Sequence, residues 1–311
     1  EHLIATIDRL MPEAVGIARR IGELKELSGV ELESARLLTE RLRAAGARVD
    51  VGVGGLPTAF RATFGSGLPR IAILAEYDAL PDLGHACGHH LSGTASTFAA
   101  IALMESGLIA HPPAPPLPQG GGETVNDFSP ARGEGEREGV GGSLIVIGTP
   151  MEESGGGKIR MIEAGVFTGV DVALMTHTSN ETRAAYRTMA SQAFRIILTS
   201  DPKEWNWRAR NITDVLVDVL TVLRIVENRA GVGTQILWAI PEGGSQNNVV
   251  PSRMVIDVGI WSYDEIMLAR TIERIRVRAM QAAEQTKVGL AFDMYEPMYL
   301  PFEPNEALVA E

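Results

Sequence analysis

The run Ile71-Ala72-Ile73-Leu74-Ala75 is followed closely by His85-Ala86-Cys87-Gly88-His89-His90. A short, fully apolar run bounded by turn-forming residues is typical of a strand buried on both faces of a sheet. The second stretch holds the only cysteine of the chain and three of its six histidines. A thiolate and an imidazole two residues apart, on a loop that leaves a buried strand, suit a borderline-soft divalent metal such as zinc.

Two further apolar runs, at 144–149 and 172–176, have the same character as the run at 71–75. Shorter strands are predicted near 47–52 and 58–64, and helices within 3–46 and at 93–103. Helical patterns alternate with the strands, so the sequence predicts an α/β fold. We expect a mainly parallel sheet with helices on both faces.

From about residue 191 the pattern changes to β-α-β-β-α-β, the order of a ferredoxin-like unit. The predicted elements are strand 193–199, helix 211–228, strands 234–240 and 253–261, helix 263–286 and strand 288–294. We therefore predict a metal-binding catalytic domain at 1–190, to which the chain returns from about 295–311, and an inserted α+β domain at 191–294. Residues 111–142 are rich in proline and glycine and are predicted to form an exposed excursion whose role the sequence does not reveal.

Composition excludes several classes of protein. The chain has 311 residues and a net charge of −11, which argues against binding to nucleic acid or to anionic membranes. No apolar run reaches the roughly 18–20 residues that cross a bilayer. A single cysteine excludes an internal disulfide framework. With no signal-peptide pattern at its start, the chain is predicted to be cytoplasmic.

Polar residues follow all three central strands. They are Asp78, Cys87 and His89 after the first, Glu152 and Glu153 after the second, and His177 after the third. The carboxyl ends of parallel strands meet at one edge of a sheet, so these side chains should converge on a site for one or two divalent ions. One of the paired glutamates can bind metal while its neighbour takes a proton from a metal-activated water. Taken singly, each has an ordinary explanation: a buried cysteine is usually a small hydrophobe, and acids favour helix starts.

These stretches resemble the M20 family of metallopeptidases and amidohydrolases. The resemblance rests on Ala75–Pro81, Gly84–His89 and Gly148–Lys158, and on Asn248-Val249-Val250-Pro251, which looks like the family's Asn-x-x-Pro. The aminoacylase-1-like branch is the closer match, with its p-aminobenzoyl-glutamate hydrolases and dipeptidases of the β-alanyl-lysine type.

The resemblance implies the hydrolysis of an amide bond in a small N-acyl amino acid or dipeptide, with two divalent metal ions, zinc or manganese. It implies metal ligands at Cys87, His89, Glu153 and His177. Glu152 would be the general base, Asp78 would hold the ligand loop as part of the catalytic set, and Asn248 would bind substrate. The inserted domain would act as a lid and form a homodimer.

Four departures from the family pattern keep an alternative open. His90 stands where the family usually has Asp or Asn, and no histidine follows His177, although the lid normally supplies one. The expected lid arginine is replaced around Ile260-Trp261, and the chain ends at Glu311, where the family returns to the catalytic domain. The alternative is a degenerate, catalytically weak member that binds metal or ligand or serves in assembly. A third possibility is an interaction domain with a structural zinc.

Overall fold

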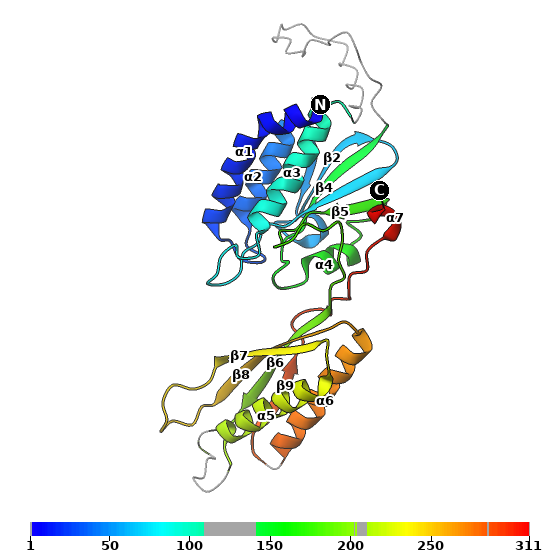
Figure 1. The fold of residues 1–311 in the computed structure, drawn as a ribbon. Helices are drawn as coiled ribbons and strands as arrows, with labels where there is room; N and C mark the ends of the chain where they lie inside the picture. The colour runs from blue at the N-terminus through cyan, green and yellow to red at the C-terminus, as the bar shows by residue number, and fades with distance from the viewer. Residues whose placement is uncertain (1, 109–140, 202, 204–209, 285, 311) are drawn as a thin grey trace, which may run out of the picture. The chain divides into compact units, whose positions relative to one another are not determined.

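A five-stranded sheet forms the centre of the first of two compact units, Glu1–Asn180 and Glu181–Glu311 (Figure 1). The computed structural model describes residues 2–108, 141–201, 203, 210–284 and 286–310. The predicted excursion at 111–142 lies outside the described residues except for its last two glycines, and the second of these already begins a strand.

The sheet of the first unit has the order β1-β2-β4-β3-β5. Its strands are β1 (Arg48–Val51), β2 (Phe60–Ser66), β3 (Arg70–Ala75), β4 (Gly142–Gly148) and β5 (Val172–Met175). Strand β3 pairs in parallel with β4 and β5, whereas β2 is antiparallel to β1 and β4. Four of the five strands therefore run in one direction, which confirms a mostly parallel sheet. The link between β2 and β3 is too short for the crossover that a parallel pair needs, so β2 runs in the opposite direction.

Helices cover both faces of this sheet. Three of them, α1 (His2–Leu24), α2 (Leu32–Ala44) and α3 (His89–Glu105), lie on one face, and α4 (Gly157–Glu163) follows β4 on the other (Figure 1). The side chains of β4 alternate between the two faces of the sheet and therefore pack against different helices. Leu144 and Val146 join the core with α1–α3, whereas Ile145 and Ile147 pack with Met161 of α4.

The helical region predicted at 3–46 consists of two helices, α1 and α2. The chain leaves the helical conformation between α1 and α2, where Lys25 and Gly29 have φ of 51° and 85°. A short 3₁₀ turn, η1 (Val53–Gly55), follows β1. Helix α3 begins four residues before the predicted start, at His89 itself, so the metal-type loop runs directly into the helix.

Gly93 allows α3 to approach the end of β3 closely. A Cβ atom at this position would lie 2.0 Å from the carbonyl oxygen of Glu76, a distance that no side chain tolerates. The small-residue helix predicted from the sequence therefore packs its backbone against the strand end. As a result, the first turn of α3 lies beside the residues that leave β3.

The second unit has the predicted β-α-β-β-α-β order. Its elements are β6 (Ala190–Thr199), α5 (Ile212–Ala230), β7 (Thr234–Glu242), β8 (Arg253–Ser262), α6 (Glu265–Glu284), β9 (Gly289–Asp293) and a last turn of helix, α7 (Glu306–Val309). The sheet order is β7-β8-β6-β9, and every pair is antiparallel. Phe194, Ile196 and Leu198 of β6 pack in one core with α5 and α6. Within the described residues, no helix combines the length and apolar character needed to span a membrane.

Candidate metal centre

Gly88 brings the cysteine loop into contact with the segment that follows β5. Its φ is 83°, in the left-handed region that favours glycine, and it forms the N-terminal boundary of α3. A Cβ here would lie 2.2 Å from the hydroxyl oxygen of Thr178. That hydroxyl also donates a hydrogen bond of 2.5 Å to the carbonyl oxygen of Cys87. The loop after β3 is thus held directly against His177, although ninety residues separate Cys87 from His177 in the chain.

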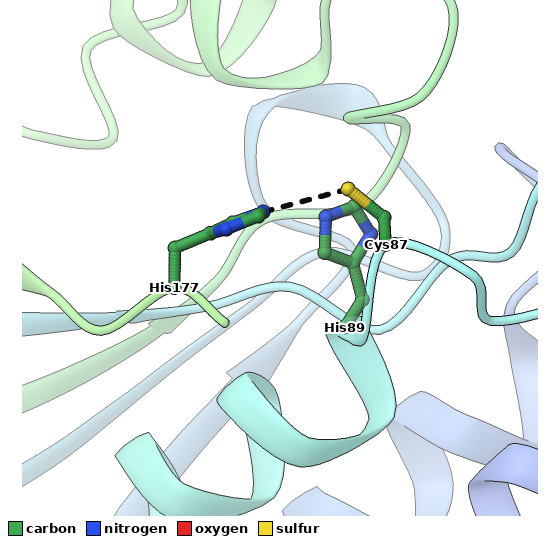
Figure 2. A group of neighbouring side chains, drawn as sticks. All are labelled: Cys87, His89 and His177. Atoms are coloured by element: carbon green, nitrogen blue, oxygen red, sulfur yellow. Dashed lines mark hydrogen bonds between the residues drawn. The ribbon is translucent and has the colours of Figure 1, made fainter. Parts of the chain in front are cut away.

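Cys87, His89 and His177 form the first possible ligand group (Figure 2). One ligand atom from each lies within 4.8 Å of those of the other two, and the Cys87 Sγ is 3.6 Å from the His177 Nε2. The His89 side chain is fully buried, whereas the other two are partly exposed. A thiolate with two imidazoles is a ligand set that suits zinc.

Glu76, His89 and Glu152 form a second group by the same criterion. The His89 Nε2 lies 3.4 Å from the Glu76 Oε2 and 3.6 Å from the Glu152 Oε2. Both groups therefore share His89, which lies at the centre of the site.

Glu76 belongs to the second ligand group although it is not among the site residues predicted from the sequence. Its side chain is 1% exposed and forms an ion pair with Lys158, while its Oε2 has no hydrogen-bond partner among the described residues. A carboxylate this deeply buried is costly unless a cation compensates it. The available signal was its position as the first residue after the apolar run 71–75, at the same strand end as the predicted ligands.

Asp78 holds the orientation of His89. The His89 Nδ1 donates a 3.1 Å hydrogen bond to the backbone carbonyl oxygen of Asp78 and also lies 3.2 Å from the carboxylate Oδ1. The Asp78 Oδ2 accepts hydrogen bonds from the Ser28 hydroxyl at 2.7 Å and the Glu153 backbone N–H at 2.9 Å. With Nδ1 occupied in this way, the Nε2 of His89 is left to face the ligand groups. A carboxylate behind a ligating imidazole is the usual arrangement in metal sites.

The glutamate pair lies on a strained turn after β4. Met151, which precedes Glu152, has φ of 61° although it is not a glycine. Its backbone N–H donates a 3.0 Å hydrogen bond to the buried Glu31, a second positioning residue that the sequence did not reveal. Glu153 lies with its Oε1 3.6 Å from the His89 Nδ1 and is in neither ligand group.

The other residues singled out in the sequence belong to neither ligand group. Asn248 is exposed on the connection between β7 and β8 of the second unit, and its role as a substrate ligand stays a prediction. His85 and His90 lie against each other, with ring centroids 5.0 Å apart, and belong to neither group. Burial lowers the pKa of His85 to about 4, and the neighbouring histidines contribute to the same shift.

The electrostatics of the site favour a bound cation. Burial would lower the pKa of His89, but the hydrogen bond to Asp78 and the nearby carboxylates outweigh it and raise this pKa to about 9. Burial and the charges of Glu153 and Glu152 raise the pKa of Cys87 to about 12. Burial also raises the pKa of Glu152. Within the part of the chain that the structure describes, the Glu76 Oε2, the Asp78 Oδ1 and the His89 Nε2 are buried without a hydrogen-bond partner. Acidic groups gathered around such atoms fit a divalent metal.

Known proteins with similar sequences are peptidases and amidohydrolases by name. No family model matches the chain. The chain is 32% identical over 262 residues to the Xaa-Arg dipeptidase of Homo sapiens, an overlap of 79% of this chain and 54% of that protein. It is 30% identical over 310 residues to a p-aminobenzoyl-glutamate hydrolase subunit of Escherichia coli, an overlap of 92% of this chain and 58% of that protein. The chain thus spans about half the length of these curated relatives.

Solved structures share the fold. The aminobenzoyl-glutamate utilization protein of Klebsiella pneumoniae matches with a TM-score of 0.74 at 17% identity, over 100% of this chain and 81% of that one. A dinuclear metal binding peptidase of the M20 family from Bacillus subtilis matches with a TM-score of 0.58 at 18% identity, over 94% of this chain and 76% of that one. In sequence and in fold, the predicted resemblance is confirmed: the chain is a relative of the M20 metallopeptidases and amidohydrolases.

Proposed function

We propose that this chain carries the metal-binding part of an M20-type amidohydrolase that cleaves the amide bond of a small N-acyl amino acid or dipeptide. The observation that carries the proposal is the convergence of the segments after β3, β4 and β5 on the buried Nε2 of His89. The names of the relatives, a dipeptidase and an aminobenzoyl-glutamate hydrolase, support amide hydrolysis as the reaction class.

Each residue of the centre has a proposed task. Cys87, His89, Glu153 and His177 would hold two divalent ions, zinc or manganese, and Glu76 adds a carboxylate on the His89 Nε2 side. When bound, such ions polarise a carbonyl and make water acidic enough to react at neutral pH.

Glu152 is the proposed general base. It would take a proton from the attacking water and pass it to the leaving amine. Burial raises the pKa of Glu152 and the charge of Lys158 opposes that rise. A carboxylate whose pKa moves toward neutrality is better matched to proton transfer in both directions. Asp78 would keep His89 in the ligating tautomer through its contact with Nδ1.

Residues 191–294, which lie within the second unit, are the proposed lid and dimerisation domain, inserted between parts of a proposed catalytic domain at 1–190 and 295–311. Apolar side chains are exposed on two of its elements, Val217 and Ile225 on α5 and Leu237 and Ile240 on β7. Such a surface supports a homodimer formed through this unit. Asn248 would contact the substrate, and we place the protein in the cytoplasm.

A degenerate member of the family is the second candidate. One observation favours it: no histidine occurs after His177 in the sequence, so the second unit cannot supply the imidazole that the family resemblance implies. Removal of one donor to a developing oxyanion typically costs about 10²–10³ in rate. Such a protein would bind metal without efficient turnover.

Metal analysis and a hydrolysis screen separate these two candidates. The purified protein is supplied with Zn²⁺ or Mn²⁺ and assayed on N-acyl amino acids and dipeptides, with and without a chelator. We expect chelator-sensitive turnover, a fall of about 10²–10⁴-fold in Glu152→Gln, and no change in Glu163→Gln, which alters an exposed acid on α4. Full activity in Glu152→Gln would contradict the mechanism. Bound metal without turnover on any substrate would favour the degenerate member.

A further inference from the structure

Three arginines line a cavity of about 440 Å³ at the edge of the first unit's sheet where β3 begins. Arg48 lies on β1, Arg61 on β2 and Arg70 on β3, and Thr63 and Ser143 line the cavity between them. Arg70 is the first residue of β3, whereas the metal centre follows its last residue. At about 3.3 Å per residue, the length of β3 places Arg70 roughly 17 Å from the last residue of the strand. The backbone of Arg61 pairs with Ile147 of β4, nearer the other end of the sheet.

Backbone carbonyl groups hold two of these guanidinium groups in place. The Arg61 Nη1 donates to the carbonyl oxygen of Val166 at 2.6 Å, and the Arg70 Nη1 donates to that of Gly169 at 3.3 Å. Gly169 permits this approach, because a Cβ there would lie 2.8 Å from the Arg70 Nη1. A guanidinium carries five N–H donors, so one such bond orients the group and leaves most of its donors available.

The charge of the three arginines is not balanced within the cavity. No acidic residue is among the described residues that line it. The Asp50 carboxylate is 4.0 Å from the Arg48 Nε in an exposed pair, and the Asp171 carboxylate accepts the backbone N–H of Arg70. Burial lowers the pKa of Arg61, and the charges of Arg70 and Arg48 lower it further. In a chain with a net charge of −11, this local excess of positive charge requires an explanation.

We propose that this cavity binds a small multivalent oxyanion, a phosphate group or a polycarboxylate. Its volume lies within the range of about 300–1,000 Å³ that small-molecule sites occupy. Guanidinium groups recognise phosphate and carboxylate through paired N–H···O bonds, and several arginines around one cavity favour an anion of more than one charge. This site is separate from the proposed hydrolysis, because the metal centre attracts cations and lies at the other end of β3.

Calorimetric titration with inorganic phosphate tests the proposal, with citrate as a second arm and sodium chloride at matched ionic strength as the control for screening. We expect saturable binding of phosphate or citrate but not chloride; the tighter of the two identifies the anion class. Arg48→Met and Arg70→Met should each weaken binding about tenfold or more, as the loss of a charge-assisted hydrogen bond predicts. Arg19→Met, an exposed arginine of α1 outside the cavity, should bind as the wild type does.

One further measurement distinguishes this cavity from the metal centre. Titration after chelator treatment should leave the affinity unchanged, whereas loss of binding on chelation would place the anion at the metal centre and overturn the proposal. Equal affinity in wild type, Arg48→Met and Arg70→Met would overturn it as well, as would the absence of saturable binding by either anion. Arg61 is partly buried and donates a hydrogen bond to the Val166 carbonyl oxygen, so the exposed Arg48 and Arg70, whose replacement leaves that bond intact, are the variants of choice.

Discussion

Metal affinity at the Cys87–His89–His177 group should rise steeply with pH. The pKa of His89 is raised to about 9 and that of Cys87 to about 12, so both groups carry a proton at neutral pH. A thiol must become a thiolate and an imidazolium must become neutral before either can ligate a metal. Metal binding therefore displaces at least these two protons.

The size of the effect follows from that count. While the pH lies below both pKa values, each displaced proton changes the affinity about tenfold per pH unit. Two protons make this about 100-fold, or roughly 2.7 kcal/mol, per pH unit. The affinity rises with pH, because His89 has a raised pKa and must lose its proton to bind. The dependence should soften to about tenfold per unit above pH 9, where His89 is already neutral.

Competition with a chromogenic chelator between about pH 6 and 8 measures this slope. Calorimetry in buffers of different ionisation enthalpy counts the protons directly. Cys87→Ser should release about one proton fewer, because a serine hydroxyl does not ionise in this range. Asp78→Asn should lower the pKa of His89 and flatten the slope, since its hydrogen bond is the main interaction that raises it. A flat affinity profile, or release of less than one proton by the wild type, would refute the reasoning.

Three other variants test the packing that positions the centre, each by chemical denaturation. Glu76→Gln should lower the free energy of unfolding by about 1–3 kcal/mol, because it leaves Lys158 without its buried partner; a stability equal to wild type would contradict this. Gly93→Ala should cost more than about 1–3 kcal/mol and weaken metal binding, because its Cβ meets a backbone oxygen at 2.0 Å. Its control, Gly16→Ala in open space on α1, should instead stabilise by about 0.5–1 kcal/mol. Leu38→Ala, at a fully buried position, should cost about 2–5 kcal/mol, and a loss below about 1 kcal/mol would argue against that packing.

The spacing of apolar residues predicted most of the helices and strands, because a helix or strand that packs on a core must place apolar side chains on the face it buries. The apolar run 71–75 became β3, which lies between β4 and β5, and the runs at 144–149 and 172–176 became its two parallel neighbours. The expectation that 172–176 is a buried strand was wrong, because β5 is at the edge of the sheet and its Leu174 and Met175 are exposed. The direction of β2 could not be inferred in the same way. It depends on the length of the link to β3 and on β4 coming between them, which is a property of the assembled sheet.

For the candidate site, position at the end of a strand identified the possible metal ligands, but it did not identify the buried residues that contact and orient them. Cys87, His89 and His177 were expected together, and the structure brings them within 4.8 Å. Glu76 was passed over, because an acid after a strand resembles an ordinary loop residue until its burial is known. Glu31 was equally hidden, since its contact with Met151 joins residues 120 positions apart.

By itself the sequence determined which residue types follow each central strand. Apolar runs are visible in the local sequence, so the end of each run, and the polar residues after it, can be located without the structure. Only the tertiary structure decided that the Nε2 of His89 is the shared centre, with Asp78 on its other nitrogen and Glu76 beside it. The physical reason is that ligation and pKa depend on distances of a few ångströms between segments far apart in the chain. Those distances are set by close backbone approaches such as those at Gly88 and Gly93, whose requirement for glycine appears only when the opposing segment is in place.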